Sequence, residues 1–324
     1  MIKNYPKKET NLFSFFLFKL FFYVILIDDW WVKFMKNIIV ITGPTGVGKT
    51  KLSVELAKKI DAEIVNADSM QIYRKLNIGT AKITEEEKEN IPHHLFDIVN
   101  PDDMYTVYDY QKNGRKLIDE LLAKNKKVII VGGTGLYIKA GLYNYTFTEG
   151  TTYNQYEDMT NQEILDRIKK FKVTETPDVN NRKRLVRLLN KVENNEDLTH
   201  NKDELLYNIK TIGLTTPREV LYERINKRVD IMLNNGLLDE INKLKDKYKN
   251  SRILNSGIGY KEFYDYLYNN KSLEEVVEEI KQNSRRFAKR QYTFFKHQFD
   301  TTWFDVDLEN FDNTINEVLE FIEK

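Results

Sequence analysis

The residues best suited to chemistry form one glycine-rich run. Residues 43–50 read Gly-Pro-Thr-Gly-Val-Gly-Lys-Thr and fill every position of the pattern G-x4-G-K-[ST]. The glycines let consecutive backbone N–H groups turn toward one oxyanion, and a helix that begins at Lys49 points its positive dipole end there. Lys49 adds a positive charge, and the Thr50 hydroxyl is suited to hold Mg²⁺. We predict a P-loop that binds a phosphate or diphosphate through Gly43, Pro44, Thr45, Gly46, Val47, Gly48, Lys49 and Thr50.

A carboxylate follows the next strand-like run, residues 62–67. Asp68 and Ser69 stand at the carboxyl end of that run. Ligands of doubly wound α/β sheets bind at the carboxyl ends of the strands, so we expect Asp68 to share a crevice with Lys49. An aspartate that caps a following helix would occupy the same sequence position. Position alone therefore leaves both interpretations open.

The elements that must position these residues indicate an α/β fold. An apolar, β-branched run over residues 37–42 precedes the glycine turn, and apolar residues at helical spacing follow over 51–60. A third buried strand, 127–131, ends in Gly-Gly-Thr-Gly, where a motor-type ATPase would be expected to carry an acid that organises Mg²⁺. The pattern predicts a P-loop-type core with a parallel sheet flanked by helices, and argues against simple nucleotide hydrolysis.

Composition excludes several classes of site. The 324 residues contain no cysteine, so neither disulfides nor thiolate metal sites are possible, which fits a reducing cytoplasm. Fifty basic residues against 49 acidic ones leave a formal charge of +1, so any nucleic acid must be met by local patches. His93 and His94 have no third ligand at metal spacing, and we expect them to form hydrogen bonds.

The first 34 residues stand apart from this pattern. Their apolar run, residues 12–27, is interrupted by Lys19 and is shorter than the roughly 20 apolar residues of a transmembrane helix. No small-residue cleavage site follows it, as a signal peptide requires. Met35 directly precedes the first strand, so we interpret residues 1–34 as a non-core extension. A membrane-surface anchor and an ordered part of the fold are the alternatives.

Three further parts are expected, each with its own composition. Residues 35–143 form the P-loop core, 144–204 a small all-helical insertion with helices near 161–171 and 181–193, and 205–324 a return to the sheet followed by helices. Two segments carry clustered basic residues. The second insertion helix has Arg182, Lys183, Arg184 and Arg187, and residues 281–297 place Arg285, Lys289, Tyr292 and Lys296 on one stripe. Both suit an RNA surface, although a solvated charged face would look the same.

An ordered set of short segments resembles the tRNA dimethylallyltransferase (isopentenyltransferase) family. Each segment is weak alone, but together they extend from about residue 35 to residue 305. They are the P-loop, Asp-Ser-Met-Gln-Ile-Tyr at 68–73, Ile-Gly-Thr-Ala-Lys at 78–82, Pro-His-His at 92–94, Phe-Asp-Ile at 96–98, Gly-Gly-Thr-Gly-Leu-Tyr at 132–137, Asn-Asn-Arg-Lys-Arg at 180–184, Ile-Gly-Tyr at 258–260 and Arg-Phe-Ala-Lys-Arg-Gln at 286–291.

The resemblance implies a reaction. A dimethylallyl group would pass from dimethylallyl diphosphate to N6 of adenosine 37, next to the anticodon, in tRNAs that read codons starting with U. The P-loop would cradle the diphosphate of the donor, with Mg²⁺ as cofactor at Thr50 and no ATP consumed. Asp68 resembles the general base, and Thr134 resembles a residue that organises the same centre. Arg228 would stabilise the departing pyrophosphate together with Lys49.

The resemblance also implies how tRNA is held. Contacts to the anticodon stem-loop and the flipped base fall on Ser69, Met70, Gln71, Arg182, Lys183, Arg184, Arg187, Lys289, Arg290 and Gln291. The family is expected to act as a cytoplasmic monomer without a membrane or an obligate protein partner. Two departures bear on stem binding: residues 145–181 are shorter than is usual, and Asn190 stands where the family often has Glu.

Three other functions remain as alternatives. Free AMP, ADP or ATP could be the prenyl acceptor, but a mononucleotide needs no basic surface at the insertion or at 281–297. A small-molecule kinase would need an arginine-bearing lid that closes on ATP. An RNA-binding module with a regulatory nucleotide site would keep its function in an Asp68→Ala variant, whereas the transferase would lose turnover.

Overall fold

The computed structural model describes residues 38–145, 147, 156–173, 176–195, 204–245, 247–248 and 250–324. The expected extension, residues 1–34, lies outside this range. The chain forms two compact units: Tyr143–Leu206 is the smaller, and the described residues up to Leu142 join Tyr207–Lys324 in the larger. Among the described helices, none combines the length and apolar character needed to span a membrane.

The larger unit is built on a six-stranded parallel sheet with the order β3-β2-β4-β1-β5-β6. Its central strand β1 is Ile38–Thr42, and every one of its residues is buried. Buried β-branched runs of this kind are typical of parallel strands that are covered on both faces. The other strands are β2 (Ala62–Asn66), β3 (His93–His94), β4 (Lys127–Val131), β5 (Ile209–Thr215) and β6 (Thr301–Asp305).

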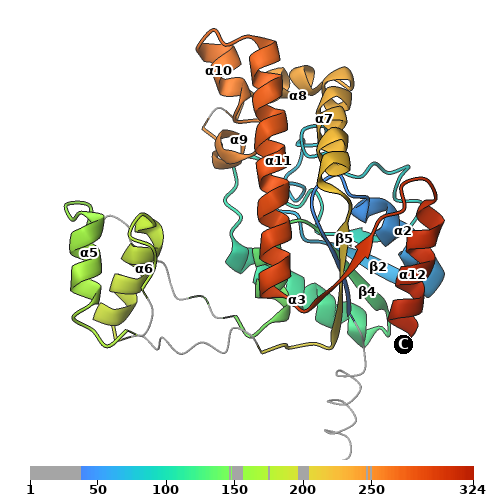
Figure 1. Ribbon diagram of the computed structural model, residues 1–324, viewed down its shortest axis with the longest axis horizontal. Coiled ribbons are helices and arrows are strands. Elements are labelled where there is room, and N and C mark those ends of the chain that lie inside the picture. Colours follow the sequence, from blue (N-terminus) through green and yellow to red (C-terminus); the bar gives the residue numbers. More distant parts are fainter. Residues whose placement is uncertain are drawn as a thin grey trace, which may run out of the picture. The chain divides into compact units, whose positions relative to one another are not determined.

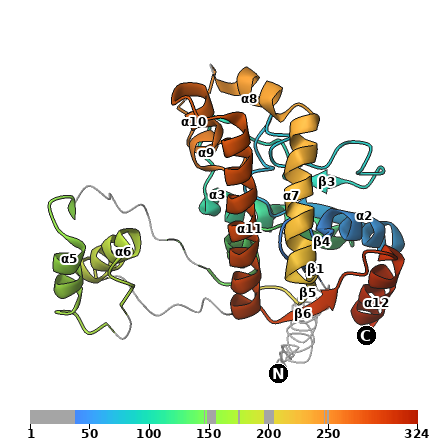
Figure 2. The same ribbon diagram turned by 45° about the horizontal axis from the view of Figure 1, so that its top comes forward.

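Helices flank this sheet (Figure 1). They are α2 (Lys49–Ile60), α3 (Val107–Ala123), α4 (Gly135–Leu142), α7 (Arg218–Asn234), α8 (Leu237–Lys245), α9 (Arg252–Ser256), α10 (Phe263–Tyr268), α11 (Leu273–Gln298) and α12 (Phe311–Glu323). One apolar core joins the sheet to α2, α7 and α12 through residues such as Leu52, Ile225 and Val318. Figures 1 and 2 show α7 and α11 side by side, and these two helices carry one wall of the site described below.

The predicted fold class, a parallel sheet flanked by helices, is confirmed. Two segments of the core have little regular structure. Thr84 and Glu87 exchange the two hydrogen bonds of a helix start, but residues 85–90 form only turns. The strand β3 is limited to His93–His94, because Leu95 and Asp97 have φ angles of 62° and 52°, which extended strands do not adopt.

Both histidines of β3 form hydrogen bonds, as expected. His93 Nδ1 lies 2.7 Å from the carbonyl oxygen of Ile91, and His94 Nε2 lies 2.7 Å from Glu63 Oε2. Within the described part of the chain, no group of three His, Cys, Asp or Glu residues could hold a metal ion.

The smaller unit contains two helices, α5 (Asn161–Ile168) and α6 (Arg182–Glu193), close to the two helical segments predicted there. A capping box between Thr160 and Glu163 begins α5, and the Asn181 side chain caps α6. The helices pack through one apolar cluster of their own, whose buried members are Tyr156, Ile164, Ile168, Leu185, Val186, Leu189 and Val192.

Candidate active site

The P-loop folds as its glycines predict. Gly43, Gly46 and Gly48 have φ angles of 136°, 83° and 109°, a region that side chains rarely adopt. A Cβ atom at Gly43 would also lie 2.5 Å from the carbonyl oxygen of Leu214 on β5, so the strand closes tightly against the loop. Lys49 at the start of α2 donates from Nζ to the carbonyl oxygens of Gly43 (3.0 Å) and Pro44 (2.8 Å). The ammonium group is therefore held directly beside the loop.

The electrostatic setting of Lys49 is unusual. Burial, reinforced by the positive charge of Arg228, lowers its pKa to about 7, and the negative charge of Asp68 opposes this shift only in part. Near neutral pH the ammonium group therefore stands close to its titration point. An anion bound in the loop would favour the charged form, because an opposite charge at short range stabilises the ammonium ion.

Asp68 lies at the carboxyl end of β2, as predicted. Its Oδ1 accepts a hydrogen bond from the Met70 amide (2.9 Å), and its own amide donates to Asn66 Oδ1 (2.9 Å). These bonds make a turn of the Asx type and fix the carboxylate, but no helix follows, so the capping interpretation is wrong. Asp68 lines a cavity, described below, and its Oδ2 would lie 3.9 Å from a Cβ atom at Gly133.

Thr134 joins the turn after β4 to the turn after β2. Its hydroxyl donates to Ser69 Oγ (3.1 Å) and accepts from the Ser69 amide (3.0 Å), and its own amide donates to the Ala67 carbonyl oxygen (3.1 Å). Gly132 permits this approach, since a Cβ atom there would lie 2.3 Å from the Ala67 backbone. The two turns therefore hold Thr134 and Asp68 in one rigid arrangement.

Arg228 brings a guanidinium group into the site from α7. Burial lowers its pKa, and the negative charge of Asp68 acts in the opposite direction. A guanidinium stays charged in proteins even when its pKa falls, so Arg228 supplies a permanent positive charge near Asp68. One turn earlier on α7, Arg224 donates from Nε to the Gly46 carbonyl oxygen (2.9 Å), which ties this helix to the P-loop.

These groups open into one cavity of about 500 Å³. Thr45, Asp68, Thr134 and Arg228 are among its lining residues. The rest of the wall is mixed and comes from α7, α9, α11 and two glycine-containing turns. Its apolar side chains are Met70, Ile225, Val229, Met232, Ile253, Ile258, Ile280 and Phe287, and its polar ones are Ser69, Thr80, Ser256, Lys261, Asn283, Ser284, Arg286 and Arg290. A cavity that offers both positive charge and apolar side chains suits an apolar group attached to a phosphate.

Part of the cavity lining has no local signal in the sequence. It comprises Ile253, Ser256, Gly257, Ile258, Gly259, Lys261, Asn283 and Ser284. The Ile-Gly-Tyr segment at 258–260 belongs to the resemblance described above, but the sequence alone assigns it no role. These residues reach the cavity through tertiary packing of α9, the turn that follows it, and α11.

Three residues assigned to tRNA contact have other partners. Gln291 is only 4% exposed, and its amide group accepts from the Thr45 amide (3.0 Å) and donates to the Gly133 carbonyl oxygen (3.1 Å). Its assignment to an RNA-contacting surface is therefore wrong. Gln71 does not line the cavity; its amide nitrogen donates to the carbonyl oxygens of Thr80 and Ala81.

Arg182 has partners within the smaller unit. Its guanidinium donates to the carbonyl oxygens of Tyr156 (2.7 Å) and Met159 (2.8 Å) and to Asn161 Oδ1 (2.9 Å), so it stabilises the smaller unit. The remaining basic residues keep exposed positions: Lys183, Arg184 and Arg187 on α6, and Lys289 and Arg290 on α11. Arg290 also lines the cavity, as do Ser69 and Met70.

The donor set near the P-loop is compatible with Mg²⁺ that is shared with a substrate. The Thr50 side chain is exposed in the first turn of α2, directly after the P-loop. Mg²⁺ prefers oxygen ligands and is commonly held by one or two protein groups together with substrate phosphates and water. An exposed hydroxyl beside the anion-binding loop fits that mode.

Comparison with known proteins shows which family this chain resembles in sequence. The family model described as "IPP transferase" matches residues 71–298. Curated relatives named tRNA dimethylallyltransferase include one from Bacillus velezensis, 45% identical over 298 residues that cover 85% of this chain and 95% of the relative. Another, from Bacillus anthracis, is 43% identical over 304 residues that cover 89% and 96%.

Solved structures agree in fold. A full-length tRNA isopentenylpyrophosphate transferase from Bacillus halodurans matches with a TM-score of 0.70 and 40% identity, over 89% of this chain and 96% of its own. A eukaryotic dimethylallyltransferase described as acting on tRNA matches with a TM-score of 0.67 and 27% identity, over 89% and 80%.

Proposed function

The chain belongs to the IPP transferase family, and from that premise we propose that it transfers a dimethylallyl group from dimethylallyl diphosphate to N6 of adenosine 37 in tRNA. The observation that carries the proposal is the cavity in which the fixed Asp68 carboxylate, the Arg228 guanidinium and a group of apolar side chains meet. The predicted acceptor tRNAs are those that read codons starting with U.

The P-loop holds the diphosphate of the donor in this proposal. Backbone N–H groups of the loop would face the phosphate oxygens, and Lys49 of α2 and Arg228 of α7 would contribute positive charge. When the bond between the allylic carbon and oxygen breaks, negative charge grows on the departing pyrophosphate. Groups already in place to meet that charge lower the barrier, because they need no reorganisation during the reaction.

Asp68 acts as the general base. Its Oδ1 is held by the Met70 amide, which leaves Oδ2 to accept a proton from N6 as the nitrogen attacks the allylic carbon. The C–O bond of the donor breaks, the N6–C bond forms, and pyrophosphate leaves. Thr134, fixed through Ser69, keeps the turn that carries Asp68 in place.

Mg²⁺ is the cofactor that we propose for this step, with Thr50 as its protein ligand. When bound, it would neutralise negative charge on the diphosphate oxygens. The protein's own contribution to leaving-group stabilisation remains the loop amides together with Lys49 and Arg228.

The acceptor base must leave its stack, because N6 cannot reach an enclosed carboxylate from within an ordered loop. Ser69 and Met70 line the cavity beside Asp68 and are our candidates for contact with the flipped adenine. Lys183, Arg184 and Arg187 of α6 and Lys289 and Arg290 of α11 would neutralise phosphates of the anticodon stem-loop.

We also propose that different segments of the chain have different roles. Residues 35–143 and 205–324 carry the chemistry, and residues 144–204 form a helical insertion that contacts the tRNA stem. The enzyme would act as a cytoplasmic monomer, away from membranes and without an obligate protein partner.

Labelled dimethylallyl diphosphate tests the donor and the acceptor together. The protein is incubated with Mg²⁺ and either an unmodified tRNA with adenosines at positions 36 to 38 or free AMP. Label in the tRNA supports the proposal. Label in AMP alone would indicate that the acceptor is a free nucleotide. Label in neither acceptor would favour the kinase alternative.

A further inference from the structure

Glu240 on α8 accepts four hydrogen bonds from two separate turns. Its Oε2 accepts from the amides of Asn77 (3.0 Å) and Ile78 (2.8 Å), and its Oε1 accepts from the Gly79 amide (3.1 Å) and the Tyr260 hydroxyl (2.7 Å). Three consecutive backbone amides therefore point at one carboxylate. Bonds to an ionised acceptor are stronger than those between neutral groups, so this contact fixes the turn firmly.

The two turns are packed as closely as their atoms allow. A Cβ atom at Gly79 would lie 2.6 Å from the Tyr260 ring. Gly259 has a φ angle of 90°, and a Cβ atom there would lie 3.2 Å from the Gly79 carbonyl oxygen. On the cavity side, a Cβ atom at Gly257 would lie 2.3 Å from Met70 Cε. A small shift of either turn would therefore be transmitted to Met70.

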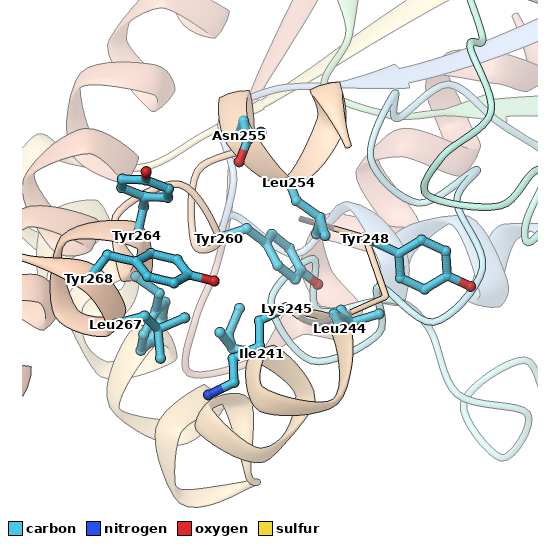
Figure 3. A pocket seen from close by; sticks show the side chains of 11 residues that line it. Ile241, Leu244, Lys245, Tyr248, Leu254, Asn255, Tyr260, Tyr264, Leu267 and Tyr268 are labelled. Atoms are coloured by element: carbon cyan, nitrogen blue, oxygen red, sulfur yellow. The ribbon is translucent and has the colours of Figure 1, made fainter. Parts of the chain in front are cut away.

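Residues 253–261 lie between two cavities. Gly257, Ile258 and Gly259 line the large cavity together with Gly79 and Thr80. The Tyr260 side chain lies on the other side, in a pocket of about 50 Å³. Figure 3 shows its ring at the centre of that pocket, with Leu254 on one side and the α8 residues Ile241 and Leu244 on the other.

A carboxylate is required at position 240, and an amide would not replace it. Burial and the negative charge of Glu240 raise the pKa of Tyr260, so the phenol stays protonated and donates. All four partners of Glu240 are thus donors, shared between its two oxygens. Glutamine has one oxygen and one NH₂ group, so at least one backbone N–H would face another donor.

We propose that Glu240 is a positioning residue for the acceptor base: it holds the turn at 77–80 against Tyr260 and thereby fixes the cavity wall on which the base at position 37 rests. The inference rests on the proposed function, because it assigns this wall to the acceptor. Glu240 lies outside the cavity lining, and its four hydrogen-bond partners, at residues 77–79 and 260, do not belong to the P-loop. It therefore acts on the acceptor and leaves the diphosphate end unchanged.

Two RNAs distinguish a change in the binding of the acceptor base from a general loss of stability. One is an unmodified anticodon stem-loop with adenine at position 37, and the other is the same RNA without that base. The ratio of their dissociation constants measures what the base contributes to binding, whereas a general loss of stability affects both RNAs alike. For the wild-type protein we expect the complete RNA to bind about tenfold or more tightly, as base stacking in a protein cavity commonly gives.

The variants are Glu240→Gln and Tyr260→Phe. Asp239→Asn is the control, because Asp239 is an exposed neighbour on the same helix α8 and is not among the residues that hold the two turns. Glu240→Gln should reduce the ratio at least threefold, and Tyr260→Phe, which keeps the ring, should reduce it less. Asp239→Asn should keep it. Binding of inorganic pyrophosphate should stay within twofold of wild type in all three, which also shows that they are folded.

An unchanged ratio in a Glu240→Gln protein that binds pyrophosphate normally would overturn the proposal. If Glu240→Gln does not fold, an unchanged ratio in Tyr260→Phe would overturn it in the same way. A wild-type protein that binds both RNAs equally would also overturn it. The proposed function is judged separately, by whether wild-type protein transfers label to the complete tRNA, so the two failures can be told apart.

Discussion

Replacing Gln291 with leucine separates a structural role from an RNA-binding role. Gln291 accepts from the Thr45 amide of the P-loop and donates to the Gly133 carbonyl oxygen of the turn after β4. Leucine has a similar size but can form neither bond. At 4% exposure the side chain excludes bulk water, so both backbone groups would be left without a partner.

The expected loss of stability follows from those two bonds. A buried backbone donor or acceptor without a partner costs about 1–3 kcal/mol, so Gln291→Leu should lose about 2–6 kcal/mol of unfolding free energy. Each kcal/mol lowers Tm by about 2–4 °C in a domain of 150–250 residues, so we expect Tm to fall by roughly 4–24 °C. Lys296→Ala on the exposed side of the same helix is the control, and it should stay within about 2 °C.

Steady-state kinetics give the second part of this test. Loss of the bond to Thr45 loosens the donor site, so the KM for dimethylallyl diphosphate should rise at least fivefold, while the KM for tRNA should stay within about twofold. Scanning calorimetry and the two KM values together distinguish a structural role of Gln291 from an RNA-binding role. A variant with unchanged Tm and a raised KM for tRNA alone would refute the structural role and restore the RNA contact.

Three further outcomes are expected. Asp68→Ala should lower single-turnover rates about a hundredfold or more, with tRNA affinity within twofold by filter binding, and near-normal turnover would exclude Asp68 as the base. The pKa of Lys49 is lowered to about 7, so its ammonium group loses its proton as pH rises through 7, and pyrophosphate affinity measured by calorimetry should fall over that range. In Lys49→Met, only the pH dependence that comes from protonation of pyrophosphate itself should remain. Gly132→Ala should destabilise the protein by several kcal/mol, because its Cβ would lie 2.3 Å from the Ala67 backbone, whereas Gly141→Ala, with its nearest atom at 3.6 Å, should be tolerated; equal melting temperatures would contradict this packing argument.

The sequence predicts those parts of the site that depend on local geometry. The P-loop is specified by consecutive residues, and Asp68 and Thr134 follow apolar runs whose carboxyl ends must meet at one edge of a parallel sheet. Arg228 has no such local sign, since it reaches Asp68 from α7, and only the resemblance to a family indicated it. The wall at 253–261 depends on glycine contacts between distant turns, which local patterns do not encode.

Gln291 was misassigned for an instructive reason. It stands in a basic segment, and that composition favoured an RNA surface. The burial pattern of α11 places it on the inward side with Ala288 and Phe295, at spacings of three and four residues. That periodicity was present in the sequence, but a polar residue on a buried helix face has no evident partner until the fold brings Thr45 and Gly133 to it.

Mass analysis of nucleosides from the reacted tRNA tests the central claim most directly. Wild-type protein, Mg²⁺ and dimethylallyl diphosphate are incubated with unmodified tRNA, and the RNA is digested and mapped. The account predicts N6-dimethylallyladenosine at position 37 and no product in a matched tRNA with guanosine at that position. A dimethylallyl group at another position, or an unmodified adenosine 37 after complete reaction of the donor, would contradict it.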